Sequence, residues 1–355
     1  MDSKISILTH TRDSFANLIY QKLGKGYEHA SIIYQEWYRQ GQITGHHPAF
    51  KNAKNLLNDI VALTDFSYLS CANSTQEGQT GKFLLKTTDG MEIESVIIPM
   101  QAGNTLCVSS QVGCRMGCSF CETGRMGLLR HLEANEIVSQ LFVAKFLFRA
   151  TIRNIVFMGM GEPFDNYDNV MQAIRVLSDP YGLGFGRNHL TISTSGCIDG
   201  IQKLMDEKEP IPNLAVSINA SNDALRNKLM PINRKHDMKA LYDQMHAFCQ
   251  KTKRQILIAY VLIKDQNDTV EHADELAHYL RGLAVKINVI PYNPQSRDRY
   301  QAPEAAVIEA FGFRLRERGY YTLLRQTKGQ KIMAACGQLG NVKLRQLIRT
   351  SKDAN

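Results

Sequence analysis

Residues 114–121 read Cys114-Arg-Met-Gly-Cys118-Ser-Phe-Cys121, so three of the eight cysteines fall in one short loop at C-x3-C-x2-C spacing. A structural zinc site takes four ligands, and a protein-bound iron–sulfur cluster normally takes four thiolates. Three thiolates leave one iron open to a small chelating molecule. A zinc site completed by a distant side chain and a set of buried structural cysteines are the alternatives. Gly113 and Gly117 would let the loop wrap tightly around a bound group.

Around this triplet the sequence alternates between apolar runs and amphipathic helical patterns. Predicted strands cover 105–109, 152–158, 190–194, 214–218, 255–263 and 285–290, and predicted helices cover 134–148, 169–177, 223–229, 238–251 and 270–283. Six strand–helix units in a row predict an α/β fold with a parallel sheet, either open or curled into a barrel. In such folds the chemistry lies at the carboxyl ends of the strands, where the cysteine loop falls.

The first 85 residues have a different pattern. Helical repeats at 13–23, 29–38 and 55–63 precede a predicted hairpin at 82–86 and 92–98 around Asp89-Gly90. We therefore predict a helical accessory domain over 1–85, which we expect to contact RNA if the substrate is RNA. A core domain follows over 86–340, and a basic tail over 341–355.

The composition is that of an ordinary globular protein, with 44% hydrophobic and 21% charged residues in a chain of 355. No apolar run has the length of a membrane span, and the first residues do not resemble a signal peptide. We therefore expect a cytoplasmic protein without a membrane partner. Clustered cysteines in that compartment favour metal binding over disulfides.

Positive charge is concentrated near the carboxyl terminus. Residues 311–355 hold ten Lys or Arg and two acidic residues, a balance of +8 that equals the net charge of the whole chain. This pattern indicates either a solvated basic surface or a face that binds phosphates, as in a nucleic-acid-binding protein.

The cysteine loop resembles that of the radical S-adenosylmethionine (SAM) superfamily. Met158-Gly-Met-Gly-Glu162-Pro, which follows a predicted strand, is similar to that superfamily's glycine-rich SAM-binding motif. The resemblance implies a partial (β/α)6 barrel and a 4Fe–4S cluster on Cys114, Cys118 and Cys121. It also implies that SAM chelates the open iron, and that an electron donor such as flavodoxin or ferredoxin drives its cleavage to a 5′-deoxyadenosyl radical.

Two more cysteines narrow the resemblance. The segments Leu106-Cys107-Val-Ser-Ser-Gln-Val-Gly-Cys114 and Ala334-Ala-Cys336-Gly-Gln-Leu339 look like those of the RlmN/Cfr family of RNA adenine methyltransferases. Either cysteine alone would more often be a small buried hydrophobe. The resemblance implies that one SAM methylates Cys336 and that the radical then activates this methyl group to add to adenine. Cys107 would resolve the crosslink by forming a disulfide with Cys336, which external thiols reduce.

Further site residues follow from the same resemblance. Glu94 matches the family's proposed proton acceptor, the alternative being a solvated hairpin glutamate. The implied SAM-binding residues are polar or backbone groups at strand ends, namely Gly161, Glu162, Ser193, Ser217, Ile218, Asn219 and Asn293. The alternative is that they are ordinary turn and capping residues at strand ends, which bind no ligand.

The expected reaction is methylation of carbon 2 of an adenosine in 23S ribosomal RNA, with transfer RNA as a second substrate. The chain departs from the family at Glu122, at Ser217-Ile-Asn-Ala220 and at Lys328-Gly-Gln-Lys-Ile-Met333. Methylation of carbon 8, as in the Cfr branch, is therefore the alternative. Another radical enzyme, such as a glycyl-radical activase, would have no use for Cys107 and Cys336. A non-catalytic cluster-binding or zinc-binding RNA module is the non-enzymatic alternative.

Overall fold

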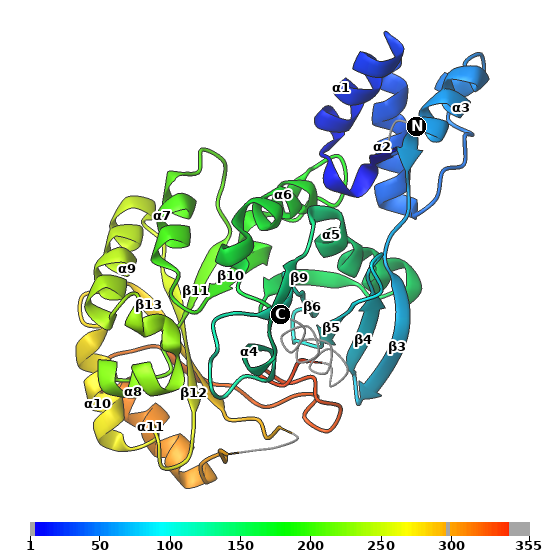
Figure 1. Ribbon diagram of the computed structural model, residues 1–355. Helices are drawn as coiled ribbons and strands as arrows, with labels where there is room; N and C mark the ends of the chain where they lie inside the picture. The colour runs from blue at the N-terminus through cyan, green and yellow to red at the C-terminus, as the bar shows by residue number, and fades with distance from the viewer. Residues whose placement is uncertain (1–3, 296–298, 341–355) are drawn as a thin grey trace, which may run out of the picture.

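A ten-stranded sheet organises the chain in the computed structural model, which describes residues 4–295 and 299–340 (Figure 1). Its strand order is β14-β13-β12-β11-β10-β9-β6-β5-β4-β3. The strands of the parallel part are β6 (Asn104–Cys107), β9 (Ile152–Phe157), β10 (Leu190–Thr194), β11 (Asn213–Ser217), β12 (Ile256–Leu262), β13 (Val285–Pro291) and β14 (Thr322–Leu324). The antiparallel extension consists of β5 (Glu92–Ile98), β4 (Thr80–Lys86) and β3 (Ser70–Glu77).

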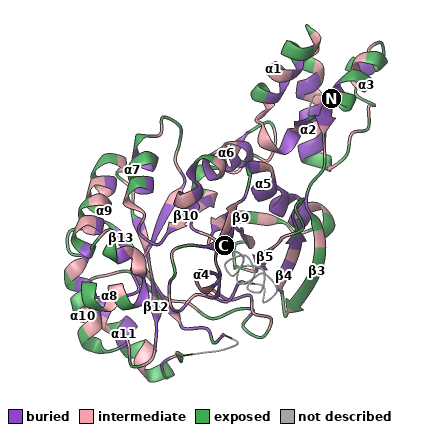
Figure 2. Ribbon diagram, viewed as in Figure 1, coloured by how far each residue is buried: buried purple, intermediate pink, exposed green. Residues whose placement is uncertain are grey.

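Helices between the parallel strands cover one face of this sheet. They are α5 (Ala134–Phe142), continued by the π-helical turn η3 (Val143–Leu147), then α6 (Tyr167–Ser178), α7 (Ile198–Asp206), α8 (Asp223–Leu229), α9 (Met238–Thr252), α10 (Val270–Tyr279) and α11 (Ala305–Glu317). Short 3-10 turns are η4 (Pro163–Asn166), η5 (Arg187–His189) and η6 (Pro231–Arg234). Along β12 every second residue is fully buried, so one side of the strand packs on the helices. Figure 2 shows the buried residues gathered on the strands and on the inner sides of the helices.

The α/β fold with its parallel-rich sheet agrees with the sequence prediction, and each of the six predicted strands is present. No hydrophobic pattern marks β3 in the sequence, because its side chains are nearly all polar and exposed (Figure 2). Such a polar strand is common at the edge of a sheet, where an apolar strand would promote aggregation. Helices α7 and α11 and strand β14 also lie outside the predicted elements.

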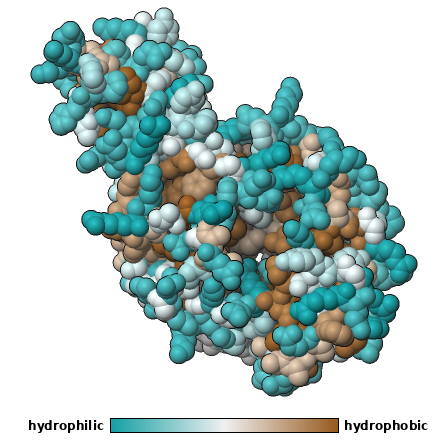
Figure 3. Space-filling model, turned by 180° about the vertical axis from the view of Figure 1, so that it is seen from behind, coloured by the Kyte–Doolittle hydropathy of each residue, from teal (hydrophilic) through white to brown (hydrophobic). Residues whose placement is uncertain are grey.

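The N-terminal helices form a separate lobe with a mostly hydrophilic surface on the face seen in Figure 3. Its elements are η1 (Ile7–Thr9), α1 (Arg12–Leu23), α2 (Tyr27–Gln40), η2 (Pro48–Phe50) and α3 (Lys54–Leu63), with β1 (Ile5–Ser6) pairing with β2 (Thr64–Asp65). Trp37 stacks on Phe142 of α5 at 5.8 Å between ring centroids, and Gln172 of α6 donates to the carbonyl of Thr9. The lobe is therefore packed on α5 and α6.

The large sheet begins before residue 86, because β3 and β4 belong to it. The helical segment itself ends at Leu63. The predicted basic tail, 341–355, lies outside the described residues. Within the described ranges, no helix combines the length and apolar character needed to cross a lipid bilayer.

Candidate active site

The three clustered cysteines lie at the end of a small two-stranded sheet and in the loop that follows its first strand. Cys114 ends β7 (Gln111–Cys114), which pairs with β8 (Gly127–His131), and Cys121 immediately precedes helix α4 (Glu122–Met126). The tight loop needs its glycine, because a Cβ at Gly113 would lie 1.9 Å from the carbonyl oxygen of Gly127. Gly113 has a φ of 78°, which L side chains rarely adopt.

The three thiols share one electrostatic environment. Burial raises the pKa of Cys114, Cys118 and Cys121, and the charge of one thiolate further raises the pKa of another. In the described ranges no three His, Cys, Asp or Glu side chains converge closely enough to hold a single metal ion. A cluster takes each thiolate on a different iron, so its ligands need not converge on one point. The donor set of three mutually coupled thiols fits an iron–sulfur cluster with one open iron.

The glycine-rich loop after β9 presses against the cysteine loop. A Cβ at Gly159 would lie 2.7 Å from the carbonyl oxygen of Val108, and a Cβ at Gly161 would lie 2.7 Å from the Cβ of Gln111. The carbonyl of Met160 also accepts hydrogen bonds from two backbone N–H groups of the cysteine-bearing segment, at 2.8 and 3.2 Å. Only glycine at these two positions allows the loops to approach so closely.

Glu162, which follows these glycines, is buried at 3% exposure. Its Oε2 accepts hydrogen bonds from the backbone N–H (2.7 Å) and hydroxyl (2.8 Å) of Ser195, and its Oε1 accepts one from the N–H of Phe164 (3.2 Å). Burial raises the pKa of Glu162, and the bonds from Ser195 oppose that rise. The loop after β9 is thereby fixed to the end of β10.

The other expected SAM-binding residues lie at the ends of neighbouring strands. Ser193 is half-buried on β10, and Ser217 ends β11. Ile218 is fully buried, and Asn219 has a left-handed φ of 55°. The amide of Asn219 is engaged within the protein, because its Oδ1 accepts from the N–H of Val261 (2.8 Å).

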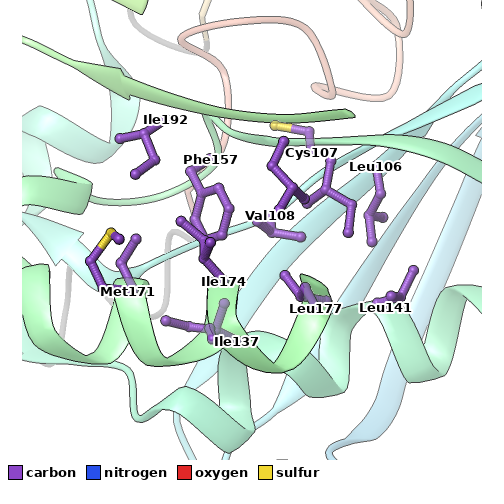
Figure 4. Close-up of a cluster of buried hydrophobic side chains, with 14 of the residues drawn as sticks. Leu106, Cys107, Val108, Ile137, Leu141, Phe157, Met171, Ile174, Leu177 and Ile192 are labelled. Carbon is purple, nitrogen blue, oxygen red and sulfur yellow. The ribbon is translucent and has the colours of Figure 1, made fainter. Parts of the chain in front are cut away.

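The charge of Cys336 acts on the thiol of Cys107, although the two residues are 229 positions apart in the sequence. The sulfur of Cys107, at the end of β6, points away from the helix layer that contacts Leu106 and Val108 (Figure 4). Burial raises the pKa of Cys107 to about 12; the charge of Cys336 acts in the same direction and that of Arg325 in the opposite one. At neutral pH the thiol form of Cys107 therefore predominates.

Hydrogen bonds fasten the Cys336 segment to the cysteine loop. The N–H of Glu122 donates to the carbonyl of Gly337 (2.8 Å), and the amide of Gln295 donates to the carbonyls of Phe120 (2.5 Å) and Gly337 (3.0 Å). Asn293, which we expected to bind SAM, donates its amide to the carbonyl of Cys336 itself (3.0 Å). The sequence motifs did not point to Gln295.

Glu94 lies on β5 at 6% exposure, beneath the Cys336 segment. Its Oε1 pairs with Lys82 at 2.9 Å, and its Oε2 accepts the N–H of Gly340 at 2.7 Å. Lys82 also donates to the carbonyl of Met333 (3.3 Å). The solvated hairpin glutamate is therefore excluded, and Lys82 emerges as its partner.

This arrangement of a cysteine triplet, a glycine-rich loop and a parallel sheet is that of a radical SAM enzyme. Residues 108–280 match the Radical SAM superfamily. The crystal structure of a radical SAM methyltransferase from Sphaerobacter thermophilus superimposes with a TM-score of 0.88 at 37% identity, covering 94% of this chain and 99% of that one.

Two curated relatives define the family more closely. A protein of Protochlamydia amoebophila (strain UWE25) named "Probable dual-specificity RNA methyltransferase RlmN 1" is 64% identical over 96% of this chain and 95% of its own length. "Dual-specificity RNA methyltransferase RlmN" of Lawsonia intracellularis (strain PHE/MN1-00) is 40% identical over 98% of this chain and 99% of its own. The chain belongs to the RlmN/Cfr family and is a radical SAM RNA methyltransferase. Membership implies that SAM and an iron–sulfur cluster are its cofactors and RNA its substrate.

Proposed function

We propose that the enzyme methylates carbon 2 of an adenosine in 23S ribosomal RNA, and that transfer RNA is a second substrate. The observation that supports this proposal is the position of Cys336: its segment is hydrogen-bonded to the cysteine loop, and its charge reaches Cys107 at the end of β6. Carbon 2 of adenine is electron-poor and does not attack a methyl sulfonium, so the chain must hold the methyl group on a carrier of its own. Cys114, Cys118 and Cys121 would hold a 4Fe–4S cluster, which, once reduced by a donor such as flavodoxin or ferredoxin, would supply the electron for the cleavage of SAM.

Each residue then has one task. Cys336 carries the methyl group, and the Asn293 amide fixes its backbone carbonyl. Glu94 takes the proton released from adenine, and the ion pair with Lys82, at 2.9 Å, holds its carboxylate in place beneath the Cys336 segment. Cys107, as a thiolate, attacks the sulfur of Cys336, so that a disulfide forms and the carbon–sulfur bond to the base breaks; the released carbon keeps the electron pair and takes up a proton to become the methyl group.

The SAM contacts in this proposal are made by the strand-end residues. Gly161 and Glu162 face the cysteine loop, and Glu162 is held by Ser195. Ser193 lies on β10 and Ser217 ends β11, and Ile218 and Asn219 follow directly after it. Asn293 completes this set, and its amide also donates a hydrogen bond to the carbonyl of Cys336.

The N-terminal lobe offers a surface for the RNA. A hollow beside the start of α3 is lined by Lys25, Lys51 and Lys54 together with Asn52 and Asn55, and its lining contains no carboxylate. Phosphate groups of the RNA backbone fit such a basic hollow. Replacing Lys51 and Lys54 by Glu should weaken RNA binding and reduce its salt dependence, measured by filter binding. Lys239→Glu, at an exposed ion pair on α9, is the matched control.

Mass spectrometry of ribosomal and transfer RNA from cells with and without the gene tests the substrate. RNA from cells that carry the gene should contain a 2-methyladenosine that is absent when the gene is deleted. An 8-methyladenosine that disappears on deletion would instead assign the Cfr-type reaction. Unchanged RNA in both strains would contradict the proposal.

A further inference from the structure

Arg226, on α8, is a fully buried arginine at 0% exposure. Its Nε donates to the carbonyl of Ile218 (3.2 Å), and its Nη2 donates to the carbonyls of Ser195 (2.7 Å) and Ser217 (3.2 Å). Its Nη1 donates to Oδ1 of Asn233 (2.9 Å). All four acceptors are uncharged. The carboxylate of Asp223 is connected only indirectly, because it accepts a hydrogen bond from the amide of Asn233 (2.7 Å).

These bonds place the guanidinium among the strand ends that face the cofactors. The carbonyl of Ser195 accepts from Arg226, while the N–H and hydroxyl of the same serine hold Glu162. A Cβ at Gly196 would lie 3.0 Å from Nη2 of Arg226, so the glycine leaves room for this approach. Arg226 therefore joins the ends of β10 and β11 and, through Ser195, the loop after β9.

The charge of Arg226 is only partly offset in the protein alone. Burial lowers its pKa, and four nearby acidic groups act in the opposite direction, those of Tyr279, Cys118, Asp223 and Cys197. A buried cation is stabilised most strongly by an anion in the same low-dielectric region. The thiolates of a bound cluster supply such an anion. A fixed positive charge near a redox centre in turn favours its reduced form, because reduction adds negative charge.

We propose that Arg226 is a positioning residue of the cofactor site, whose charge makes the cluster easier to reduce and whose hydrogen bonds hold the strand ends that bind SAM. This inference rests on the proposed function, because it presupposes a cluster on the cysteine triplet. It adds a residue outside the motifs to the machinery that makes the radical.

Arg254 provides a matched control at the other end of the same strand. It donates to the carbonyls of Ile211 (2.5 Å) and Pro212 (2.9 Å) and to Oδ1 of Asn213 (2.6 Å), at the start of β11. Burial lowers the pKa of Arg254 too. The two arginines thus make the same kind of contact at opposite ends of β11.

The test compares anaerobically reconstituted wild type, Arg226→Gln, Arg226→Lys and Arg254→Gln. The midpoint potential of the cluster is measured by redox titration with electron paramagnetic resonance, and the Kd for SAM and the Tm are measured in parallel. Arg226→Gln should shift the potential to more negative values and weaken SAM binding about tenfold. Arg226→Lys should keep the wild-type potential but weaken SAM binding, because lysine cannot reproduce the four bonds.

Arg254→Gln should lower the Tm and leave both the potential and the Kd unchanged. An unchanged potential in Arg226→Gln would overturn the role of the charge, and equal effects of Arg226→Gln and Arg254→Gln would reduce Arg226 to a structural residue. If Arg226→Gln does not fold, Arg226→Lys decides, because a lowered potential or an unchanged Kd in that variant overturns the proposal. A wild type that binds no cluster would contradict the proposed function itself, which separates the two failures.

Discussion

The two ends of the parallel strands are stabilised in different ways. At the amino ends, Arg175 pairs with Glu207 (3.2 Å) and Glu209 (3.1 Å), and Lys251 pairs with Asp206 (2.7 Å), all with partly exposed side chains. At the carboxyl ends, Arg226 and Glu162 are buried and bonded to uncharged groups, whereas Arg254, which makes similar bonds at the amino end of β11, is only half-buried. Exposed ion pairs contribute about 0.2–1 kcal/mol each, whereas a buried charge without a direct partner has a larger desolvation cost. This desolvation cost falls at the carboxyl ends of the strands, where the clustered cysteines lie.

The largest expected effect at the carboxyl end comes from removing the methyl carrier. Cys336→Ala should abolish RNA methylation while the cluster's visible absorbance stays intact, since Cys336 is not a cluster ligand in the proposal. Cys249→Ala is the control, because the Cys249 thiol contacts the carbonyl of Ala284 just before the amino end of β13. Methylated RNA from the Cys336 variant, measured by mass spectrometry, would exclude the covalent mechanism.

Removing the resolving thiol should stop the same reaction one step later. Cys107→Ala should accumulate a covalent protein–RNA crosslink, visible as a slow band on a denaturing gel. Cys71→Ala, a half-buried cysteine on β3, should behave as wild type. If Cys107→Ala turned over without a crosslink, its assigned role would be wrong.

A smaller loss is expected when the proton acceptor is neutralised. Glu94→Gln should lower the rate of RNA methylation by about 10²–10⁴-fold, the usual contribution of a general base. Cleavage of SAM to 5′-deoxyadenosine should continue, because Glu94 is not involved in it. Glu209→Gln, at an exposed amino-end pair, should leave both rates unchanged. Equal loss of both reactions in Glu94→Gln would indicate a general structural defect instead.

The pKa of Cys107 predicts a pH dependence for the resolving step. Burial raises that pKa from 9.0 to about 12, so only a small fraction is thiolate near neutrality. Decay of the crosslink in a single turnover should therefore accelerate roughly tenfold per pH unit between pH 7 and 9. The buried thiol also contributes stability below pH 9, which is lost as the pH rises toward 12. A decay rate independent of pH would place another step in control.

The smallest effect is expected at the amino ends. Arg175→Ala removes two partly exposed ion pairs and should lower the free energy of unfolding by about 1 kcal/mol or less, as measured in urea. SAM cleavage by the folded variant should remain at the wild-type rate. A decrease of several kcal/mol in the free energy of unfolding would contradict the proposed difference between the amino and carboxyl ends of the strands.

The sequence predicted what local patterns encode. Strand β6 and the strands from β9 to β13 were found because β-branched residues concentrate in them, whereas β7 and β8 were missed; the cysteine triplet was found by its spacing. Gln295 and Lys82 were missed because they act on segments far away in the chain, Phe120 and Met333. Arg226 resembles a solvated residue in Leu225-Arg-Asn-Lys-Leu229, although it lies three residues before the fully buried Leu229. This helical spacing, which places Arg226 on the same face of α8 as Leu229, was the signal that could have indicated its burial.

The fastening of the Cys336 segment limits how far a methyl group can travel. The carbonyl of Cys336 is held by Asn293, and the next carbonyl along the chain is held by Gln295 and the N–H of Glu122. In the proposed mechanism, the backbone of the carrier residue is therefore fixed, and only the cysteine side chain is free to rotate. A base stacked inside an RNA helix cannot reach a sulfur held in this way, so the target nucleotide has to leave its stack and enter the site.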